Sequence, residues 1–521
     1  MATPQEKLAE SLEVLKGLQD RSVVAVRTSD LSRGHRERLL KNGFLQEVMK
    51  GWYIPARPDE AAGESTAWYA AFWPFCAAYL HARFDKNWCL SPEQSLSLHA
   101  GNQAVPPQLL VRTPKAGNKP TALPYDTSLL DIRAAVPSEK DIEERDGLRL
   151  FSLSAALIGA SPAFYENQPI DARAALATIS DASEVLNRLL EGGHSTIAGR
   201  LAGAFRNIGR ERIAVDILKT MRAAGYEVRE RDPFASRIAL ALPRREVSPF
   251  ASRIRLMWQQ MRGPVIERFP ASPGKPNDID TYLKRVADVY VTDAYHSLSI
   301  EGYRVSPELI ERVRTGNWNP ETDERDRGHH DALAARGYWQ AYNAVQDSLR
   351  RVLRSENPGT VADEDFSTWY REMFTPIVTA GLLRPTDLAG YRNGPVFIRR
   401  SMHVPPSSDA VRDAMPVFFE MLTEETEPAV RVVLGHFIFV YIHPYTDGNG
   451  RMGRFLMNVM LAAGGYPWSV VPLERRDTYM AALEDASVRQ DIVPFTKVLA
   501  DLVEAGLKGK PVATTPAAAS S

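Results

Sequence analysis

Two apolar segments on either side of a short polar stretch constrain the fold of this chain most strongly. VRVVLGHFIFVYI, residues 430–442, and FLMNVMLAAGG, residues 455–465, are apolar around nearly the whole circumference of a helix. A helix without a polar face has to be surrounded by other parts of the protein. The sequence therefore predicts two central helices, joined by the intervening stretch HPYTDGNGRMGR, residues 443–454.

The glycines and arginines of this stretch predict an anion site. Gly448-Asn449-Gly450 can turn sharply and present successive backbone N–H groups at the start of the following helix, where the helix dipole also favours negative charge. Arg451 and Arg454 share a helix face because they are three residues apart. Their guanidinium groups can therefore grip different phosphates of one polyphosphate.

Asp447 and His443 add further chemistry to the predicted anion site. A single carboxylate, completed by phosphate oxygens and water, commonly holds Mg²⁺, so Asp447 is a candidate metal ligand. His443 is a candidate general base for an incoming hydroxyl. Because Pro444 follows it, we expect His443 to adopt an extended backbone at the end of the preceding helix. Taken singly, such a turn, arginine pair or histidine is more often structural, but their combined spacing favours a site.

The stretch resembles the signature of the Fic family, HPFx(D/E)GNGRxxR, with Tyr445 in place of the usual phenylalanine. The resemblance implies transfer of AMP from ATP to a Ser, Thr or Tyr hydroxyl of a protein, with release of pyrophosphate. It implies that His443 is the general base and that Asp447 holds Mg²⁺. Relatives that transfer phosphate or phosphocholine usually depart from this motif, so its intact form favours AMP transfer. The residues implied to bind ATP and its phosphates are Gly448, Asn449, Gly450, Arg451, Met452, Gly453 and Arg454.

SLSIEG, residues 297–302, resembles the inhibitory motif (S/T)xxxE(G/N) of the same family, which lies on a helix before the catalytic core. By position, Glu301 is the inhibitory glutamate and Ser297 is the first residue of the motif. A carboxylate paired with Arg454 would occupy the guanidinium that the γ-phosphate needs, and would repel the phosphate itself. In some Fic enzymes this glutamate instead positions a water that removes AMP from a modified protein, so the direction of the reaction stays open.

Two further segments resemble parts of the Fic family. GYRNGPVFIRRSMHVPP, residues 390–406, resembles the β-hairpin flap on which a segment of the target protein is held by strand addition. An ordinary hairpin is the alternative, and the target protein is unknown. ERRDTYMAAL, residues 474–483, resembles the segment that lines the adenine pocket, which assigns Tyr479 and Met480 to that pocket.

The first part of the chain predicts a winged helix: a helix, a turn, a second helix and a hairpin that turns at Lys50-Gly51. Residues 26–58 resemble the N-terminal winged helix of AbiEi-type antitoxins, with the sequence VRTSDLSRGHRERLLKNGFLQEVMKGWYIPARP. A module that docks another protein is the alternative to DNA binding. The competing function is a DNA-binding regulator that uses the Fic domain as a toxin or sensor. The basic residues expected on the second helix, and so the candidate DNA contacts, are Arg33, Arg36, Arg38 and Lys41.

The length of 521 residues predicts a multi-domain protein. The N-terminal part is expected to be α+β and the C-terminal part to be a mostly α-helical Fic fold with its β-hairpin flap. We expect a winged-helix-like domain at 1–60, an AbiEi-like α+β middle region at 61–243, the Fic domain with its inhibitory helix at 244–510 and a disordered tail at 511–521.

Composition restricts the partners and the compartment. The net charge of -1 excludes a global basic field, so any contact with DNA has to be local. Cys76 and Cys89 lie among apolar residues, which indicates buried thiols in a reducing compartment. The N-terminus lacks the apolar stretch of a secretory signal, so we expect a cytoplasmic protein without membrane contact. The apolar run 67–80 is shorter than the roughly 20 residues of a membrane-spanning helix, so we expect a core segment. A homo-oligomer stays possible.

Overall fold

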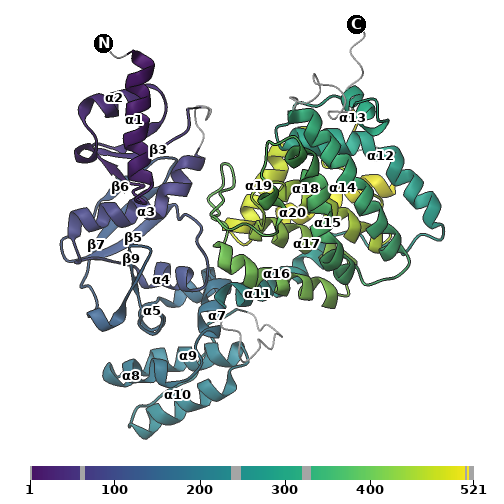
Figure 1. The fold of residues 1–521 in the computed structure, drawn as a ribbon. Coiled ribbons are helices and arrows are strands. Elements are labelled where there is room, and N and C mark those ends of the chain that lie inside the picture. The colour runs from purple at the N-terminus through teal and green to yellow at the C-terminus, as the bar shows by residue number, and fades with distance from the viewer. Residues whose placement is uncertain (1–2, 59–64, 236–247, 319–329, 511–512, 516–521) are drawn as a thin grey trace. The chain divides into compact units, whose positions relative to one another are not determined.

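The computed structural model describes residues 3–58, 65–235, 248–318, 330–510 and 513–515. The chain is mostly helical with three small sheets among these residues (Figure 1). It divides into two compact units, and we call residues 1–253 together with 397–405 the first unit, and residues 254–396 together with 406–521 the second unit. The predicted tail at 511–521 lies mainly outside the described residues.

The beginning of the first unit has the predicted order of helix, helix and hairpin. The hairpin turns at Lys50-Gly51 as expected, and Gly51 has a φ of +85°, which favours glycine. The three strands form an antiparallel sheet in the order β1-β3-β2. The assignment to the antitoxin winged helix stays a prediction. The elements are α1 (Pro4–Gln19), β1 (Val26–Arg27), α2 (Arg33–Lys41), β2 (Leu45–Met49) and β3 (Trp52–Pro55).

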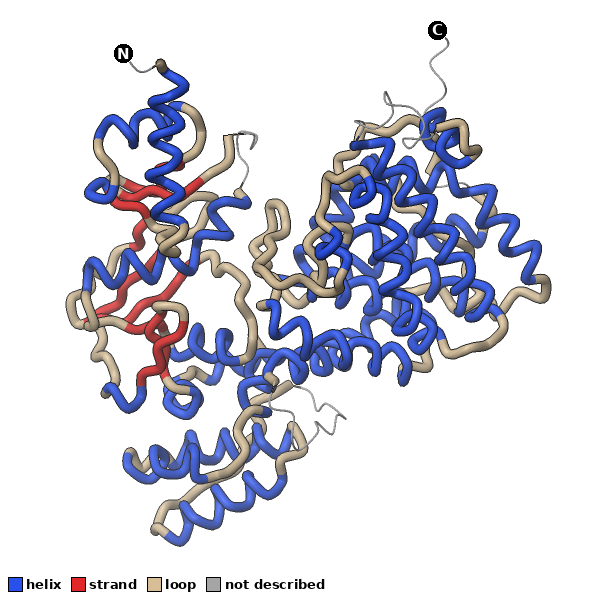
Figure 2. The backbone as a smooth tube through the Cα atoms, in the orientation of Figure 1, coloured by secondary structure: helices blue, strands red, loops and turns tan. Residues whose placement is uncertain are grey.

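The middle of the first unit contains helix α3 (Thr66–Phe84), which includes the predicted core run at 67–80. Its aromatic and aliphatic side chains pack in one cluster with residues of the neighbouring strands, so the run is buried as expected. Cys76 and Cys89 are buried free thiols, as predicted. The strands, drawn red in Figure 2, are β4 (Cys89–Leu90), β5 (Gln108–Thr113), β6 (Pro120–Ala122), β7 (Ser128–Arg133), β8 (Ile142–Arg145) and β9 (Leu148–Phe151).

The strands of the middle region form two sheets, and seven further helices accompany them among the described residues. β5 and β7 are parallel in a sheet ordered β4-β5-β7-β6, while β8 and β9 form a separate antiparallel pair. The following helices are α4 (Pro92–His99), α5 (Leu153–Gly159), α6 (Pro162–Asn167), α7 (Pro169–Ala177), α8 (Ser183–Glu191), α9 (Ser195–Asn207) and α10 (Glu211–Ala223).

The described part of the second unit contains helices and no strand. The two apolar segments form the predicted central helices, α17 and α18, and every residue from Arg451 to Ala462 is buried. The helices are α11 (Pro249–Arg268, in this unit from Ile254), α12 (Ile279–Ile300), α13 (Pro307–Arg314), α14 (His330–Leu353), α15 (Pro358–Thr379), α16 (Ser408–Glu424), α17 (Pro428–Ile442), α18 (Asn449–Ala463), α19 (Arg476–Val488) and α20 (Val493–Leu507).

The predicted flap, residues 390–406, differs from the expectation. The structure describes all of these residues and assigns no strand to them, so the expected strand pair is wrong. Pro395, Pro405 and Pro406 lack the backbone N–H that a ladder needs. The segment is an irregular excursion whose residues 397–405 group with the first unit.

Candidate functional site

The loop after α17 aims His443 by an unusual backbone conformation. His443 is left-handed (φ +53°, ψ +59°) rather than extended, so the expectation drawn from Pro444 is wrong. Its N–H donates to the carbonyl of Phe439 at 3.0 Å, and this bond closes the helix. The ring Nδ1 lies 3.1 Å from the carbonyl of Val440. Because a carbonyl can only accept, Nδ1 carries the proton and Nε2 is left as the acceptor.

The electrostatics of His443 suit a base. Burial lowers the pKa of the ring to about 4, and the nearby Arg392 also lowers it. The imidazole is therefore neutral at pH 7 and able to accept a proton at Nε2.

Two side chains that sequence reasoning did not assign to this purpose fix the loop. Asn449 accepts from the N–H of Tyr445 at 2.9 Å through Oδ1 and donates to its carbonyl at 2.8 Å through Nδ2. Arg392 donates from Nε to the carbonyl of His443 at 2.8 Å, and its backbone N–H donates to Pro444 at 2.9 Å. Arg392 lies within the predicted flap segment, but its contact with the motif joins residues 51 positions apart. No local pattern indicates such a contact.

The glycine turn contains one left-handed glycine and one glycine in close contact with another element. Gly448 has a φ of +82° and precedes the first residue of α18. Gly450 lies against the carboxylate of Glu301, where an added Cβ would come within 2.2 Å of Oε1. A side chain at position 450 would therefore displace the glutamate, so the close approach needs glycine.

Arg451 is fully buried beside the turn. Its Nη2 donates to Oδ2 of Asp447 at 3.1 Å, and its guanidinium lies 5.1 Å from the ring centroids of both Tyr303 and Phe374. Nε and Nη1 have no hydrogen-bond partner among the described residues. A buried cation with unused donors is costly unless an anion completes its bonding, so the geometry provides a place for a phosphate.

Arg454, one turn further along α18, is also buried, and its partners lie on the last turn of α12 and directly after it. Nη2 donates to Oε1 of Glu301 at 2.7 Å and to the carbonyl of Ser297 at 2.9 Å. Nε donates to the hydroxyl of Ser297 at 2.9 Å. The expected pairing of Glu301 with Arg454 is therefore present, and Ser297 contacts the same arginine, which was not predicted.

The candidate adenine residues have different environments. Tyr479 is buried, and its hydroxyl lies 2.6 Å from Nε2 of His436, whose Nδ1 lies 2.7 Å from the carbonyl of Gly453. The histidine thereby links α17, α18 and α19, and the ring of Tyr479 belongs to the core. Met480 is half-buried. His436 lies in the apolar run before the motif, and sequence reasoning missed it.

Asp447 differs from the other charged residues of the motif because its side chain is 62% exposed. Oδ1 accepts from the N–H of Gly448 at 2.6 Å, and Oδ2 accepts from Arg451. Among the residues that the structure describes, no group of three or more His, Cys, Asp or Glu residues could hold a metal ion. A metal at Asp447 would therefore need ligands from a substrate.

The four basic side chains of α2 that are candidate DNA contacts differ in exposure and in their bonds within the protein. Arg33 is exposed and pairs with Glu37 at 2.7 Å. Arg38 donates to the carbonyl of Lys7 and to Oγ of Ser11, both at 2.8 Å, so it fastens α1 to α2. Arg36 is half-buried, with its guanidinium 5.9 Å from the ring centroid of Tyr53, and Lys41 is exposed.

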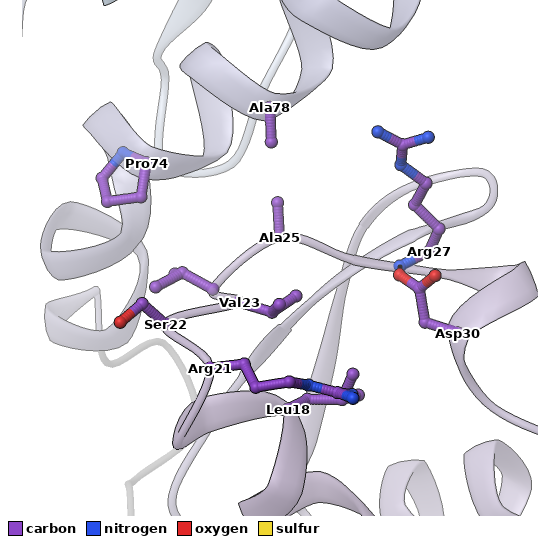
Figure 3. Close-up of a pocket in the computed structure, with 10 residues that line it drawn as sticks. Leu18, Arg21, Ser22, Val23, Ala25, Arg27, Asp30, Pro74 and Ala78 are labelled. Atoms are coloured by element: carbon purple, nitrogen blue, oxygen red, sulfur yellow. Dashed lines mark hydrogen bonds between the residues drawn. The ribbon is translucent and has the colours of Figure 1, made fainter. Parts of the chain in front are cut away.

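Two pockets are lined by residues outside the motif. One of about 490 Å³ belongs to the first unit, and Figure 3 shows Ala25 and Ala78 facing each other across it, with Arg27 and Asp30 to one side. The other, of about 470 Å³, belongs to the second unit and is lined partly by Asp363, Tyr391 and Glu420.

No helix within the described ranges has both the length and the apolar character to span a membrane.

Comparisons with known proteins agree with the motif. Residues 363–461 match the model of the Fic/DOC family. The curated protein adenylyltransferase Fic of Nematostella vectensis is 29% identical over 239 residues, 45% of this chain and 52% of that protein. The Drosophila willistoni protein of the same name is 34% identical over 233 residues, 44% of this chain and 43% of its own length. The chain spans about half the length of these relatives.

Among solved structures, a fragment of Fic-1 from C. elegans covers 64% of this chain and 87% of its own, with 18% identity and a TM-score of 0.36.

Proposed function

Because residues 363–461 form a Fic domain, we propose that this protein is an adenylyltransferase that moves AMP from ATP onto a Ser, Thr or Tyr hydroxyl of a protein. The environment of Arg451 carries the proposal. Its buried cation keeps unused donors beside a left-handed glycine at the start of a helix, a combination that suits a polyphosphate. The curated relatives named protein adenylyltransferase support the same reaction.

In the proposed reaction, Nε2 of His443 accepts the proton of the attacking hydroxyl. A bond forms between the hydroxyl oxygen and the α-phosphorus, while the bond from that phosphorus to the bridging oxygen breaks. The two electrons of the broken bond leave with pyrophosphate. The turn at 448–450 binds phosphate oxygens through backbone N–H groups, and Arg451 balances the charge of the leaving group. The carbonyl contact with Arg392 holds His443 in place during the transfer.

Asp447 is the residue that would hold Mg²⁺, together with phosphate oxygens of ATP. Its exposed carboxylate fits this role, because Mg²⁺ at a nucleotide site can be held by a single protein carboxylate together with phosphate oxygens and water. When bound, the ion would offset the negative charge that develops on pyrophosphate.

Glu301 is proposed to inhibit the reaction. Its carboxylate takes a donor of Arg454 and lies against Gly450, so it adds negative charge where phosphate oxygens would come. ATP would then bind with its α-phosphate turned away from in-line attack. Release of this contact gives Arg454 to the γ-phosphate.

The position of Glu301 over Gly450 also favours a second candidate, removal of AMP. A carboxylate beside the phosphate turn could position a water for attack on the phosphorus of AMP attached to a protein. The two directions use the same residues and differ in whether Glu301 is needed. Loss of Glu301 should increase AMP attachment and abolish AMP removal.

The proposal is tested by mass spectrometry of a mixture of cellular proteins incubated with ATP, Mg²⁺ and Glu301→Gly protein. We expect AMP on Ser, Thr or Tyr side chains of particular proteins, and none when Glu301→Gly is combined with His443→Ala. Absence of AMP from every protein, including the enzyme itself, would contradict the proposed function. Incubation of AMP-modified protein with the unaltered chain then tests removal.

A further inference from the structure

Residues 397–405 lie in the middle of the matched Fic region, yet they belong by their contacts to the first unit. The side chains of Met402 and Val404 pack against the hydrophobic cluster built on α3, β5 and β7. The carbonyl of Met402 accepts a hydrogen bond from the N–H of Val105 at 2.8 Å. The N–H of Arg400 donates to Oγ1 of Thr66 at 3.2 Å. We call residues 397–405 the latch segment.

Hydrogen bonds within the latch segment occupy further backbone groups, in addition to those bound to residues 1–253. The N–H of Ser401 donates to the carbonyl of Ile398 at 3.1 Å, and the N–H of His403 donates to Oγ of Ser401 at 3.1 Å. Strand addition by another protein requires free backbone N–H and C=O groups on an extended edge. The latch segment offers neither an extended strand nor its full set of backbone groups.

A single arginine of the second unit binds the chain on both sides of the latch segment. Arg392 of the second unit donates to the carbonyl of Gly394 at 2.9 Å and to the carbonyl of Pro406. The same arginine holds the carbonyl of His443. Because the latch segment belongs to the same chain as Val105, Thr66 and the α3 cluster, its effective concentration at these residues is high. Modest contacts therefore suffice to keep it bound there.

We propose that residues 1–253 act as an intramolecular inhibitor that captures the latch segment and withholds the flap from target proteins. Release of the latch segment from Val105, Thr66 and the α3 cluster would free the backbone of the flap for a target. This inhibition acts on access of the target protein and is independent of the Glu301–Arg454 ion pair. Its effect on transfer rests on the proposed adenylyltransferase function, whereas the capture itself does not.

Capture is tested by amide hydrogen exchange on the full chain carrying His443→Ala, which prevents self-modification. Met402→Asp places a charge against the apolar cluster and should accelerate exchange at least about tenfold, both in the latch segment and at Val105, whose N–H donates to it. Phe397→Asp is the matched control, because Phe397 is 37% exposed, and should leave exchange at Val105 unchanged.

Exchange of the latch segment at the rate of an unstructured peptide, before any latch substitution, would overturn the capture. An unchanged rate at Val105 in Met402→Asp would overturn it as well.

The inhibitory effect is tested with variants of the first unit, so that the flap sequence stays intact. Val105→Pro removes the N–H that binds Met402, and Thr66→Val removes the acceptor of Arg400 in case the proline variant does not fold. In a Glu301→Gly background, either change should raise AMP transfer to target proteins at least about threefold.

The two proposals can fail separately. Accelerated exchange without increased transfer by an active Glu301→Gly enzyme would show that the latch segment is captured but does not inhibit, which overturns the regulatory proposal. Absence of AMP transfer in all variants contradicts the adenylyltransferase proposal, and the exchange experiment then decides the capture alone.

Discussion

Helices α2 and α18 each carry two arginines three residues apart, but these pairs have different environments. Arg33 is 84% exposed in its side chain and bonds to Glu37 of its own helix, while Arg36 is half-buried. Arg451 and Arg454 are both buried. Arg451 keeps unused donors, whereas Arg454 donates to Glu301, the residue that follows α12. Identical spacing thus predicts a shared face, whereas burial and unused donors indicate a ligand site.

His443→Ala should have the largest effect, because it removes the proposed general base, which lies in the loop before α18. Loss of the general base should lower AMP transfer by about 10²–10⁴-fold in the Glu301→Gly background. Radiolabelled ATP measures the rate. His81→Ala is the control, since this imidazole on α3 is exposed, and it should retain full activity. Equal rates for the His443 variant and its parent would remove His443 from the mechanism.

Arg451→Ala should have the next largest effect, which is on ATP affinity. It tests directly whether the arginines of α18 and α2 differ in function. Loss of charge-assisted hydrogen bonds worth about 1.5–3 kcal/mol should weaken ATP binding by about 10–100-fold. Calorimetric titration of ATP into the His443→Ala, Glu301→Gly protein measures the affinity. Arg33→Ala in the same background is the matched control and should bind ATP normally. Equal affinities for the two arginine variants would break the distinction between the helices.

The pH dependence separates His443 from an ordinary exposed histidine. A pKa of about 4 keeps the base neutral down to about pH 5, so kcat/KM should stay nearly constant from pH 7.5 to about 5.5. A base with the usual pKa of about 6.5 would lose roughly tenfold over that range. A pH profile of Glu301→Gly protein measures this, and a decline centred near pH 6.5 would contradict the assignment.

Folding has to be monitored in the same pH series. Burial lowers the pKa of His436 to about 3. The unfolded chain, with a histidine pKa of about 6.5, binds this proton more readily than the folded chain does. The contribution of His436 to stability is therefore complete above about pH 6.5 and is lost progressively as the pH falls toward 3. Circular dichroism at each pH separates this loss from titration of the base.

The smallest effect is expected within α2. Arg38→Ala removes the bonds to Lys7 and Ser11 and should lower the unfolding free energy of the first unit by about 1 kcal/mol. Arg33→Ala should leave that stability unchanged, because its only described ion pair is exposed. Urea denaturation measures both. A larger loss for Arg33→Ala than for Arg38→Ala would show that these roles are reversed.

Local patterns predicted much of the second unit. The apolar circumference of α17 and α18 placed both helices in the core, and the motif brought His443, Asp447 and the arginines together. The contact between Glu301 and Arg454 joins residues 153 positions apart, and only resemblance to a family predicted it.

The incorrect predictions have physical causes as well. The usual effect of a following proline predicted an extended His443, but backbone hydrogen bonds with Phe439 and Arg392 accompany its left-handed conformation. The strand pair expected at 390–406 does not form, because prolines interrupt it and the first unit binds its middle. Both outcomes depend on contacts between residues far apart in the sequence, which periodicity cannot report.

The proposed inhibition by the Glu301–Arg454 ion pair is tested most directly by the rate of AMP incorporation in the unaltered chain, Glu301→Gln and Glu301→Gly, at equal ATP and Mg²⁺. A hydrogen bond to a charged group is worth about 1.5–3 kcal/mol, so Glu301→Gly should incorporate AMP at least about tenfold faster than the unaltered chain. Glu301→Gln, which keeps the size but removes the charge, should lie between them. Equal incorporation by all three proteins would contradict inhibition through Arg454.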